Sequence, residues 1–157
     1  MPIVVDTSVA LKWIRIEVYT TQAEALRDDH LRRRDTIYAP SLLVSEAASG
    51  LHRFARDGSL TQTEAIAGLD EVLAVLRIRP VSRTIAKRAM AIASQTDMKH
   101  AYDVQFLALA ERLNCDLWTA DEAFQKTMSR TDPRSTIFQT GQRFISWVQT
   151  WAGWARR

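Results

Sequence analysis

The sequence predicts an α/β fold of three layers, with helices on both faces of a short-stranded, mostly parallel central sheet. Short β-branched or apolar runs alternate along the chain with longer segments whose apolar residues recur at helical spacing. Strands this short, separated by helices, imply a parallel sheet that is covered on both faces. The length of 157 residues, 46% of them hydrophobic, predicts a single domain over residues 1–157 with a full core.

The first half of the chain is expected to supply two strands and four helices. Ser41 directly follows a proline and is placed to cap a helix, and Thr61 with Glu64 forms a capping-box pattern at the start of the next one. In order, we expect a buried strand over 3–5, a short helix over 9–14, a charged helix over 21–34, a strand over 36–39, a helix from Ser41 to Gly58 and a helix opened by Thr61.

The second half continues the alternation of strands and helices. In order, we expect a strand over 76–79 stopped by Pro80, an Ala-rich helix over 82–96, a helix over 102–113, a strand over 115–119, a helix opened by Asp121, a last strand over 136–138 and a terminal helix over 142–154. Residues 142–157 would then form a C-terminal helical extension of the domain.

Charge and cysteine content give a first indication of compartment and partners. The formal net charge is +3 and the pI about 9.3, which suits an anionic partner without requiring one. The single cysteine, Cys115, excludes an intrachain disulfide, as is typical of a reducing cytosol, and is expected to be a core residue. No leader peptide or membrane-spanning apolar run is recognisable, so we expect a cytoplasmic protein with no membrane partner.

Four carboxylates stand where one expected element gives way to the next. Asp6 and Asp121 follow two strands, and Asp103 and Glu46 lie in the early turns of two helices, on or beside their apolar faces. Because ligands of open α/β sheets bind beyond the carboxyl ends of the strands, all four could converge on one pocket. Buried acids without basic partners are costly, and a bound divalent cation would make the arrangement physically sensible.

The ligand chemistry of such a pocket favours Mg²⁺ or Mn²⁺ over Zn²⁺. The candidate ligands are hard carboxylate oxygens, without thiolates or paired histidines. Hydrolysis of a phosphodiester is the natural reaction, because a cation there would activate water and polarise a phosphoryl oxygen. Thr7, Ser8 and Thr119 could orient ligands or water through their hydroxyl groups. Clustered acids repel one another, so without metal at least one should titrate above its usual pKa.

Each acid also has a simpler interpretation. Asp6, Asp103 and Asp121 could merely cap the helices that they precede, and Glu46 could be a solvated flank residue. These interpretations would require four separate coincidences. A non-catalytic module that binds metal, RNA or protein at the sheet edge is the principal alternative. A phosphate-accepting aspartate is disfavoured because no strand end offers the lysine which that chemistry usually needs.

Four segments together resemble the PIN-domain ribonucleases of the VapC toxin family. They are VVDTSVALKW at 4–13, PSLLVSE at 40–46, YDVQFLALA at 102–110 and LWTAD at 117–121. Their order and approximate spacing match the family's motifs from the start of the chain to about Asp121. Each segment alone is weak, whereas the four together are quite specific.

The resemblance implies a PIN fold and an Mg²⁺- or Mn²⁺-dependent endoribonuclease that acts as the toxin of a toxin–antitoxin pair. It also implies a homodimer, inhibition by a cognate antitoxin, and tRNA as a candidate target. One departure is Ser49, which stands where the family often has Asn. The residues that match the family's metal-binding, catalytic quartet are Asp6, Glu46, Asp103 and Asp121, and Thr119 matches a supporting hydroxyl residue.

Basic and aromatic residues outside the motifs leave several alternatives open. Glu17 is the best fifth acid. A phosphate track around the pocket could be formed by Lys12, Arg15, Arg53, Arg56, Lys99 and His100, although any surface has such residues. Three tryptophans recur at helical spacing near the C-terminus and could pack in the core or dock on a second subunit or an antitoxin helix. They are Trp147, Trp151 and Trp154.

Overall fold

A computed structural model describes residues 1–129 and 144–146 of the chain. Its centre is a five-stranded sheet in the order β3-β2-β1-β4-β5, in which every neighbouring pair is parallel. The strands are β1 (Ile3–Val5), β2 (Ile37–Pro40), β3 (Leu76–Arg79), β4 (Asp116–Thr119) and β5 (Phe144–Ser146). The parallel sheet that the short apolar runs predict is confirmed.

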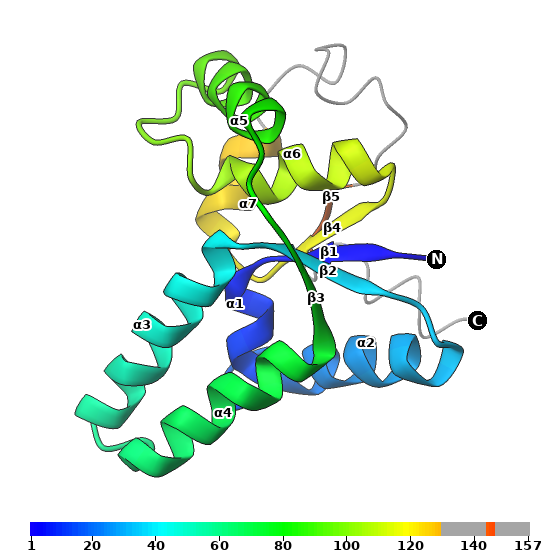
Figure 1. Cartoon of the computed structure of the whole chain (residues 1–157). Helices are drawn as coiled ribbons and strands as arrows, with labels where there is room; N and C mark the ends of the chain where they lie inside the picture. Colours follow the sequence, from blue (N-terminus) through cyan, green and yellow to red (C-terminus); the bar gives the residue numbers. More distant parts are fainter. Residues whose placement is uncertain (130–143, 147–157) are drawn as a thin grey trace.

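Helices cover both faces of this sheet, which confirms the three-layer α/β/α fold. The helices on one face are α1 (Thr7–Ala10), the 3₁₀ helix η1 (Leu11–Trp13), α2 (Thr20–Arg33), α3 (Leu42–Arg56) and α4 (Gln62–Val75). On the other face lie α5 (Arg83–Gln95), α6 (Val104–Leu113) and α7 (Glu122–Ser129), as Figure 1 shows. Within the described residues, no helix is long and apolar enough to span a bilayer.

The central strand β1 sets the position of the site. Its three β-branched residues are buried, as expected for a strand with helices on both faces. Val5 pairs with Trp118 of β4, and the backbone N–H of Asp6 continues the ladder by donating to the Trp118 carbonyl at 3.0 Å. This register brings the carboxyl ends of β1 and β4 side by side.

Local capping signals account for several helix boundaries. Thr61 and Glu64 form both hydrogen bonds of the predicted capping box at the start of α4. Gly58, at φ +81°, follows the end of α3 in the left-handed region, which glycine adopts without a steric cost. Ser41 precedes α3 as predicted but makes no capping bond, because its backbone is already helical and its hydroxyl accepts from the Val81 N–H at 3.4 Å.

The helices α3 and η1 approach each other closely at a glycine. A Cβ atom on Gly50 of α3 would lie 2.6 Å from Cδ1 of Leu11. The missing side chain therefore lets α3 pack directly against the segment that follows Asp6. This packing fixes Glu46, one turn earlier on α3, relative to the end of β1.

The C-terminal region differs from the sequence-based expectation. Phe144–Ser146 form β5, which pairs with β4, so the helix predicted over 142–154 is wrong for these three residues. Phe and Ile favour strands, and the open edge of β4 offers backbone partners that helical spacing does not reveal. The remainder of that helix, its tryptophans and the strand predicted over 136–138 lie outside the described residues.

Candidate active site

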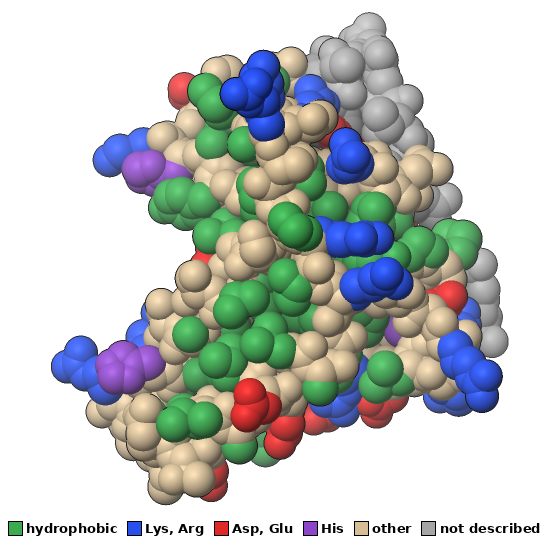
Figure 2. Space-filling view, viewed as in Figure 1, with side chains coloured by type: hydrophobic (Ala, Val, Ile, Leu, Met, Phe, Trp, Pro, Cys, Tyr) green, Lys and Arg blue, Asp and Glu red, His purple; other side chains and the backbone are tan. Residues whose placement is uncertain are grey.

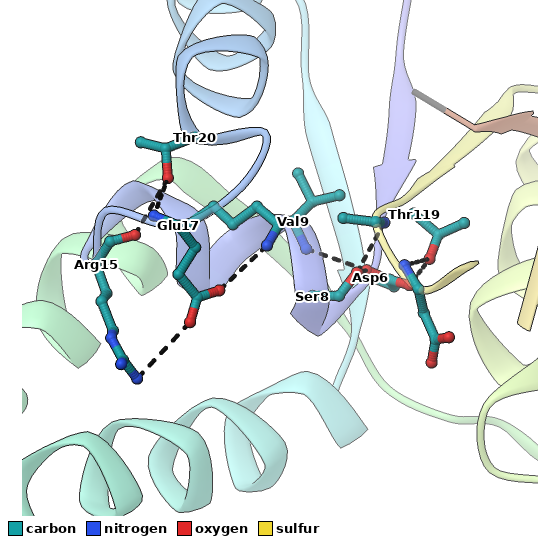
Figure 3. Close-up of polar contacts among 10 residues, drawn as sticks. Asp6, Ser8, Val9, Arg15, Glu17, Thr20 and Thr119 are labelled. Carbon is teal, nitrogen blue, oxygen red and sulfur yellow. Dashed lines mark hydrogen bonds and ion pairs between the residues drawn. The ribbon is translucent and has the colours of Figure 1, made fainter. Parts of the chain in front are cut away.

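Asp6 stands at the end of β1 with its carboxylate enclosed by hydrogen-bond donors. The residue is 8% exposed. Its Oδ1 accepts from Ser8 Oγ at 2.5 Å and from the Val9 N–H at 3.2 Å, and its Oδ2 accepts from Thr119 Oγ1 (Figure 3). A carboxylate has about four lone-pair positions, so these three bonds leave one position on Oδ2 for a further ligand.

The hydroxyl groups beside Asp6 also connect two strands. Ser8 Oγ accepts from the Ala120 N–H at 2.8 Å, and Thr119 Oγ1 accepts from the Asp121 N–H at 3.0 Å. Each hydroxyl therefore donates to Asp6 and accepts from the backbone after β4. These contacts hold both the Asp6 carboxylate and the start of the Asp121 segment. The supporting role of Ser8 and Thr119 at a metal stays a prediction.

Glu46 reaches the same region from α3. Its Oε2 accepts a hydrogen bond from Thr7 Oγ1, which belongs to the first turn of α1. The residue is half-buried. Thr7 therefore joins an acid from one helix to the segment that carries Asp6, thirty-nine residues away.

Asp103 and Asp121 occupy the starts of α6 and α7. Asp121 is exposed and caps α7, because its Oδ1 accepts from the N–H groups of Ala123 and Phe124 at 2.8 and 3.0 Å. The capping interpretation is therefore correct for one of its oxygens. Asp103 has a helical backbone and makes no capping bond, so its carboxylate is not occupied by the helix that follows it.

The pKa values indicate that the four acids share one electrostatic environment. Asp121 raises the pKa of both Asp6 and Asp103, and Asp103 raises the pKa of Glu46. Burial is nevertheless the largest cause of the raised pKa in all three, and it lifts Asp6 from 3.8 to about 6. The expectation of an acid with a raised pKa is confirmed, but desolvation contributes more to it than repulsion.

None of the four acids forms an ion pair within residues 1–129 and 144–146. Glu17, by contrast, is ion-paired with Lys12 Nζ at 3.1 Å and with Arg15 at 3.7 Å. Figure 3 shows this network beside Asp6. Asp6 is buried, Glu46 and Asp103 are partly buried, and none of them has a neutralising cation among the described residues. A positive ligand would stabilise such a group of acids.

The donor set fits a hard divalent cation that retains much of its water. In the part of the chain that the structure describes, no three Asp, Glu, His or Cys side chains are grouped to hold an ion directly. Mg²⁺ is commonly bound by only one or two carboxylates and several waters. One position on Asp6, Oδ2 of Asp121 and Oε1 of Glu46 have no hydrogen-bond partner among the described residues, and Asp103 has none on either oxygen.

Several residues expected near the pocket have other partners. Lys12 is buried and bonded to Glu17, so it does not form an exposed phosphate track, and Glu17 is neutralised rather than a free fifth acid. The hydroxyl of Ser49 donates to the Ser45 carbonyl at 2.9 Å and is exposed. The sequence did not predict the Lys12–Glu17 ion pair, because a regular helix brings together residues three or four apart. Residues five apart meet here because the chain forms a 3₁₀ turn after α1.

Residues 3–128 match the family described as "PIN domain". The chain is 36% identical over 140 residues to "Ribonuclease VapC9" of Mycobacterium tuberculosis and to "VapC ribonuclease Mb0985" of Mycobacterium bovis, covering 86% of this chain and 98% of each relative. The fold resembles that of VapBC2 from Rickettsia felis, whose structure was solved bound to a promoter DNA fragment. The TM-score is 0.62 and the sequence identity 18%, over 94% of this chain and 99% of that one. VapBC-1 from nontypeable Haemophilus influenzae gives a TM-score of 0.61 and 12% identity over 95% and 100% of the two chains.

Proposed function

This chain belongs to the PIN-domain family, and we propose that it is a metal-dependent endoribonuclease that acts as the toxin of a toxin–antitoxin pair in the cytoplasm. The observation that carries the proposal is a set of four acids from separate elements, none of them ion-paired within the described residues. Asp121 raises the pKa of Asp6 and Asp103, and Asp103 raises that of Glu46. Two relatives that match most of the chain are named ribonucleases, which supports the same reaction. We take the unit as a single domain over residues 1–157.

Asp6, Glu46, Asp103 and Asp121 would hold the cation, either directly or through its waters. A bound Mg²⁺ or Mn²⁺ would supply Lewis-acid chemistry, polarising a phosphoryl oxygen and activating water at neutral pH. Ser8 and Thr119 keep the Asp6 carboxylate in one orientation through their hydroxyl groups.

Two of these four acids, Glu46 and Asp103, are also suited to accept the proton of the attacking water. Glu46 and Asp103 have raised pKa values and at least one carboxylate oxygen without a described partner. A carboxylate whose pKa is raised towards the working pH is a better general base than an unperturbed one. Thr7 fixes the Glu46 side chain by donating to Oε2, which leaves Oε1 to accept a hydrogen bond from water.

The direct test is RNA cleavage by the purified chain with Mg²⁺, with Mn²⁺ and with excess EDTA. We expect cleavage with metal, none in EDTA, and products with 5′-phosphate and 3′-hydroxyl ends. Asp6→Asn, Asp103→Asn and Asp121→Asn should each abolish cleavage while circular dichroism shows a retained fold. Asp70→Asn, which neutralises an exposed acid on α4, is the matched control and should cleave normally.

Two outcomes would contradict this activity. Undiminished cleavage in EDTA or in the three pocket variants would exclude the metal site, and 2′,3′-cyclic phosphate ends would indicate a different mechanism. RNA binding without cleavage under any metal would favour the alternative, a non-catalytic PIN-like module.

The toxin role and the partners require separate experiments. Expression should arrest growth, and co-expression of a small neighbouring gene product should relieve the arrest by forming a complex. End-mapping of cellular RNA from wild type and Asp6→Asn would test tRNA as the target. Light scattering would test the proposed homodimer.

A further inference from the structure

The loop between α5 and α6 has a fixed conformation that separates its inward and outward residues. It begins where Asp97 takes a φ of +52° and the Met98 N–H donates to the Ala93 carbonyl at 2.9 Å, a left-handed helix ending. Met98 and Ala101 then pack against the hydrophobic core. The loop is therefore anchored at two points, and its other side chains are directed towards solvent.

Two outward residues of this loop stack on each other. The rings of His100 and Tyr102 lie 5.1 Å apart between centroids, with planes inclined by only 18°. Tyr102 is 45% exposed, which is unusual for a large aromatic ring held in a defined position. Lys99, directly before the pair, is also exposed. The loop thus presents two parallel rings and a cation on its surface.

The stacked pair lies beside the acidic pocket. Tyr102 immediately precedes Asp103, and consecutive Cα atoms are about 3.8 Å apart across a trans peptide; the described chain has no cis peptide. His100 partly offsets the raised pKa of Asp103, as a neighbouring cationic group does, although burial remains its largest cause. A phosphodiester held at the acids would therefore place a neighbouring nucleotide within reach of the rings.

The space-filling view shows that this face of the molecule is hollowed. Figure 2 shows the hollow between the part formed by the α5–α6 loop and the part formed by α3, with histidine and Lys or Arg side chains at both outer ends. The outer half of α3 carries His52, Arg53 and Arg56. A polyanion entering the hollow would meet these cations at its rims.

We propose that the His100–Tyr102 pair is a stacking site for one unpaired base of the RNA, next to the phosphodiester that is cut; this rests on the proposed function. An RNA base fits because it offers a flat π face and is joined to a phosphate that Lys99 can contact. A duplex would keep its bases stacked on one another, so the site selects single-stranded segments. Because the loop is anchored, its rings require little ordering on binding.

The proposal is tested by binding in EDTA, which separates it from cleavage. An RNA oligonucleotide carrying 2-aminopurine is used, and the fluorescent base is moved through successive positions. We expect quenching at one position with wild type and with Tyr102→Phe, which keeps the ring. Tyr102→Ala should lose the quenching and bind the RNA roughly 5- to 150-fold more weakly. Met90→Ala, an exposed apolar residue on α5, serves as the control and should behave as wild type.

A second measurement separates stacking from a general structural effect. Replacing the nucleotide at the quenched position by an abasic one should weaken the affinity of the wild type for the RNA by the same factor as the Tyr102→Ala substitution does. The same replacement should not change the affinity of Tyr102→Ala for the RNA. Equal abasic penalties in wild type and Tyr102→Ala, or no quenching at any position, would overturn the stacking site. If wild type cuts no RNA under any metal while quenching persists, the proposed function fails and the stacking site stands.

Discussion

Substitution of Asp6 by Asn should make the metal-free protein more stable at neutral pH while abolishing its activity. Burial raises the pKa of Asp6 from 3.8 to about 6. At 1.36 kcal/mol for each pKa unit, ionised Asp6 lowers the free energy of unfolding by about 3 kcal/mol relative to the neutral acid. Asn has nearly the same shape and no charge, so it removes this cost.

The gain should be smaller than the full electrostatic cost. Asn retains a carbonyl oxygen for Ser8 and the Val9 N–H, but its amide group faces Thr119, whose hydroxyl proton would lose its acceptor. One lost hydrogen bond costs about 1 kcal/mol. We therefore expect the variant to be more stable than wild type by about 2 kcal/mol at pH 7.5 in EDTA.

The pH dependence identifies the cause. The folded protein binds the Asp6 proton more tightly than the unfolded chain, so the wild type is relatively most stable below pH 3.8. Its stability should fall as the pH rises from 3.8 towards about 6 and then level off, through this group alone. The difference between Asp6→Asn and wild type should therefore shrink by about 2 kcal/mol between pH 7.5 and pH 4.5.

Urea denaturation at both pH values measures these differences. Asp70→Asn is the matched control, because it removes one charge from the exposed surface of α4 and should show no such dependence. Millimolar Mg²⁺ should reduce the difference at pH 7.5 by stabilising only the wild type. A variant that is less stable than wild type at pH 7.5, or a difference of equal size at both pH values, would refute the reasoning.

Three further substitutions test other contacts of the fold and the site. Thr119→Val removes a hydrogen-bond donor to Asp6, so the pKa of Asp6 should rise further. The acid limb of the pH–rate profile of RNA cleavage should then move to higher pH, and an unmoved limb would contradict this role. Arg88 donates to both oxygens of Glu111, at 2.6 and 2.8 Å, and Arg88→Met removes this partner. The free energy of unfolding, measured by urea denaturation, should fall by about 2–4 kcal/mol. Ser49→Ala should leave the cleavage rate within about twofold, because the hydroxyl donates to its own helix; a tenfold loss would show that it supports the site.

Local sequence signals predicted most element boundaries because they act over a few residues. The Thr61–Glu64 capping box and the turn at Gly58 occur where the sequence places them. The short apolar runs gave the parallel strands, since a strand buried on both faces needs continuous apolar residues. The helix predicted near the C-terminus failed at Phe144–Ser146, because pairing with the edge of β4 is a long-range contact that periodicity cannot detect.

The residue types of the site were also readable from the chain. Asp6, Glu46, Asp103 and Asp121 stand in four motifs, and their position near strand ends or helix starts was enough to predict convergence at one sheet edge. Their chemistry as hard oxygen donors is a property of the side chains themselves.

Tertiary structure alone decided how each group is held and charged. The sequence does not indicate that Thr119 and Ser8 both donate to Asp6, or that Lys12 is engaged by Glu17 rather than facing a substrate. It also leaves unspecified that His100 and Tyr102 stack beside Asp103. The residue types, and with them the kind of chemistry, are encoded locally in the sequence. Desolvation and hydrogen-bond geometry depend on atoms from distant segments, so the electrostatic setting of the site arose only when β1, β4, α3 and α6 packed together.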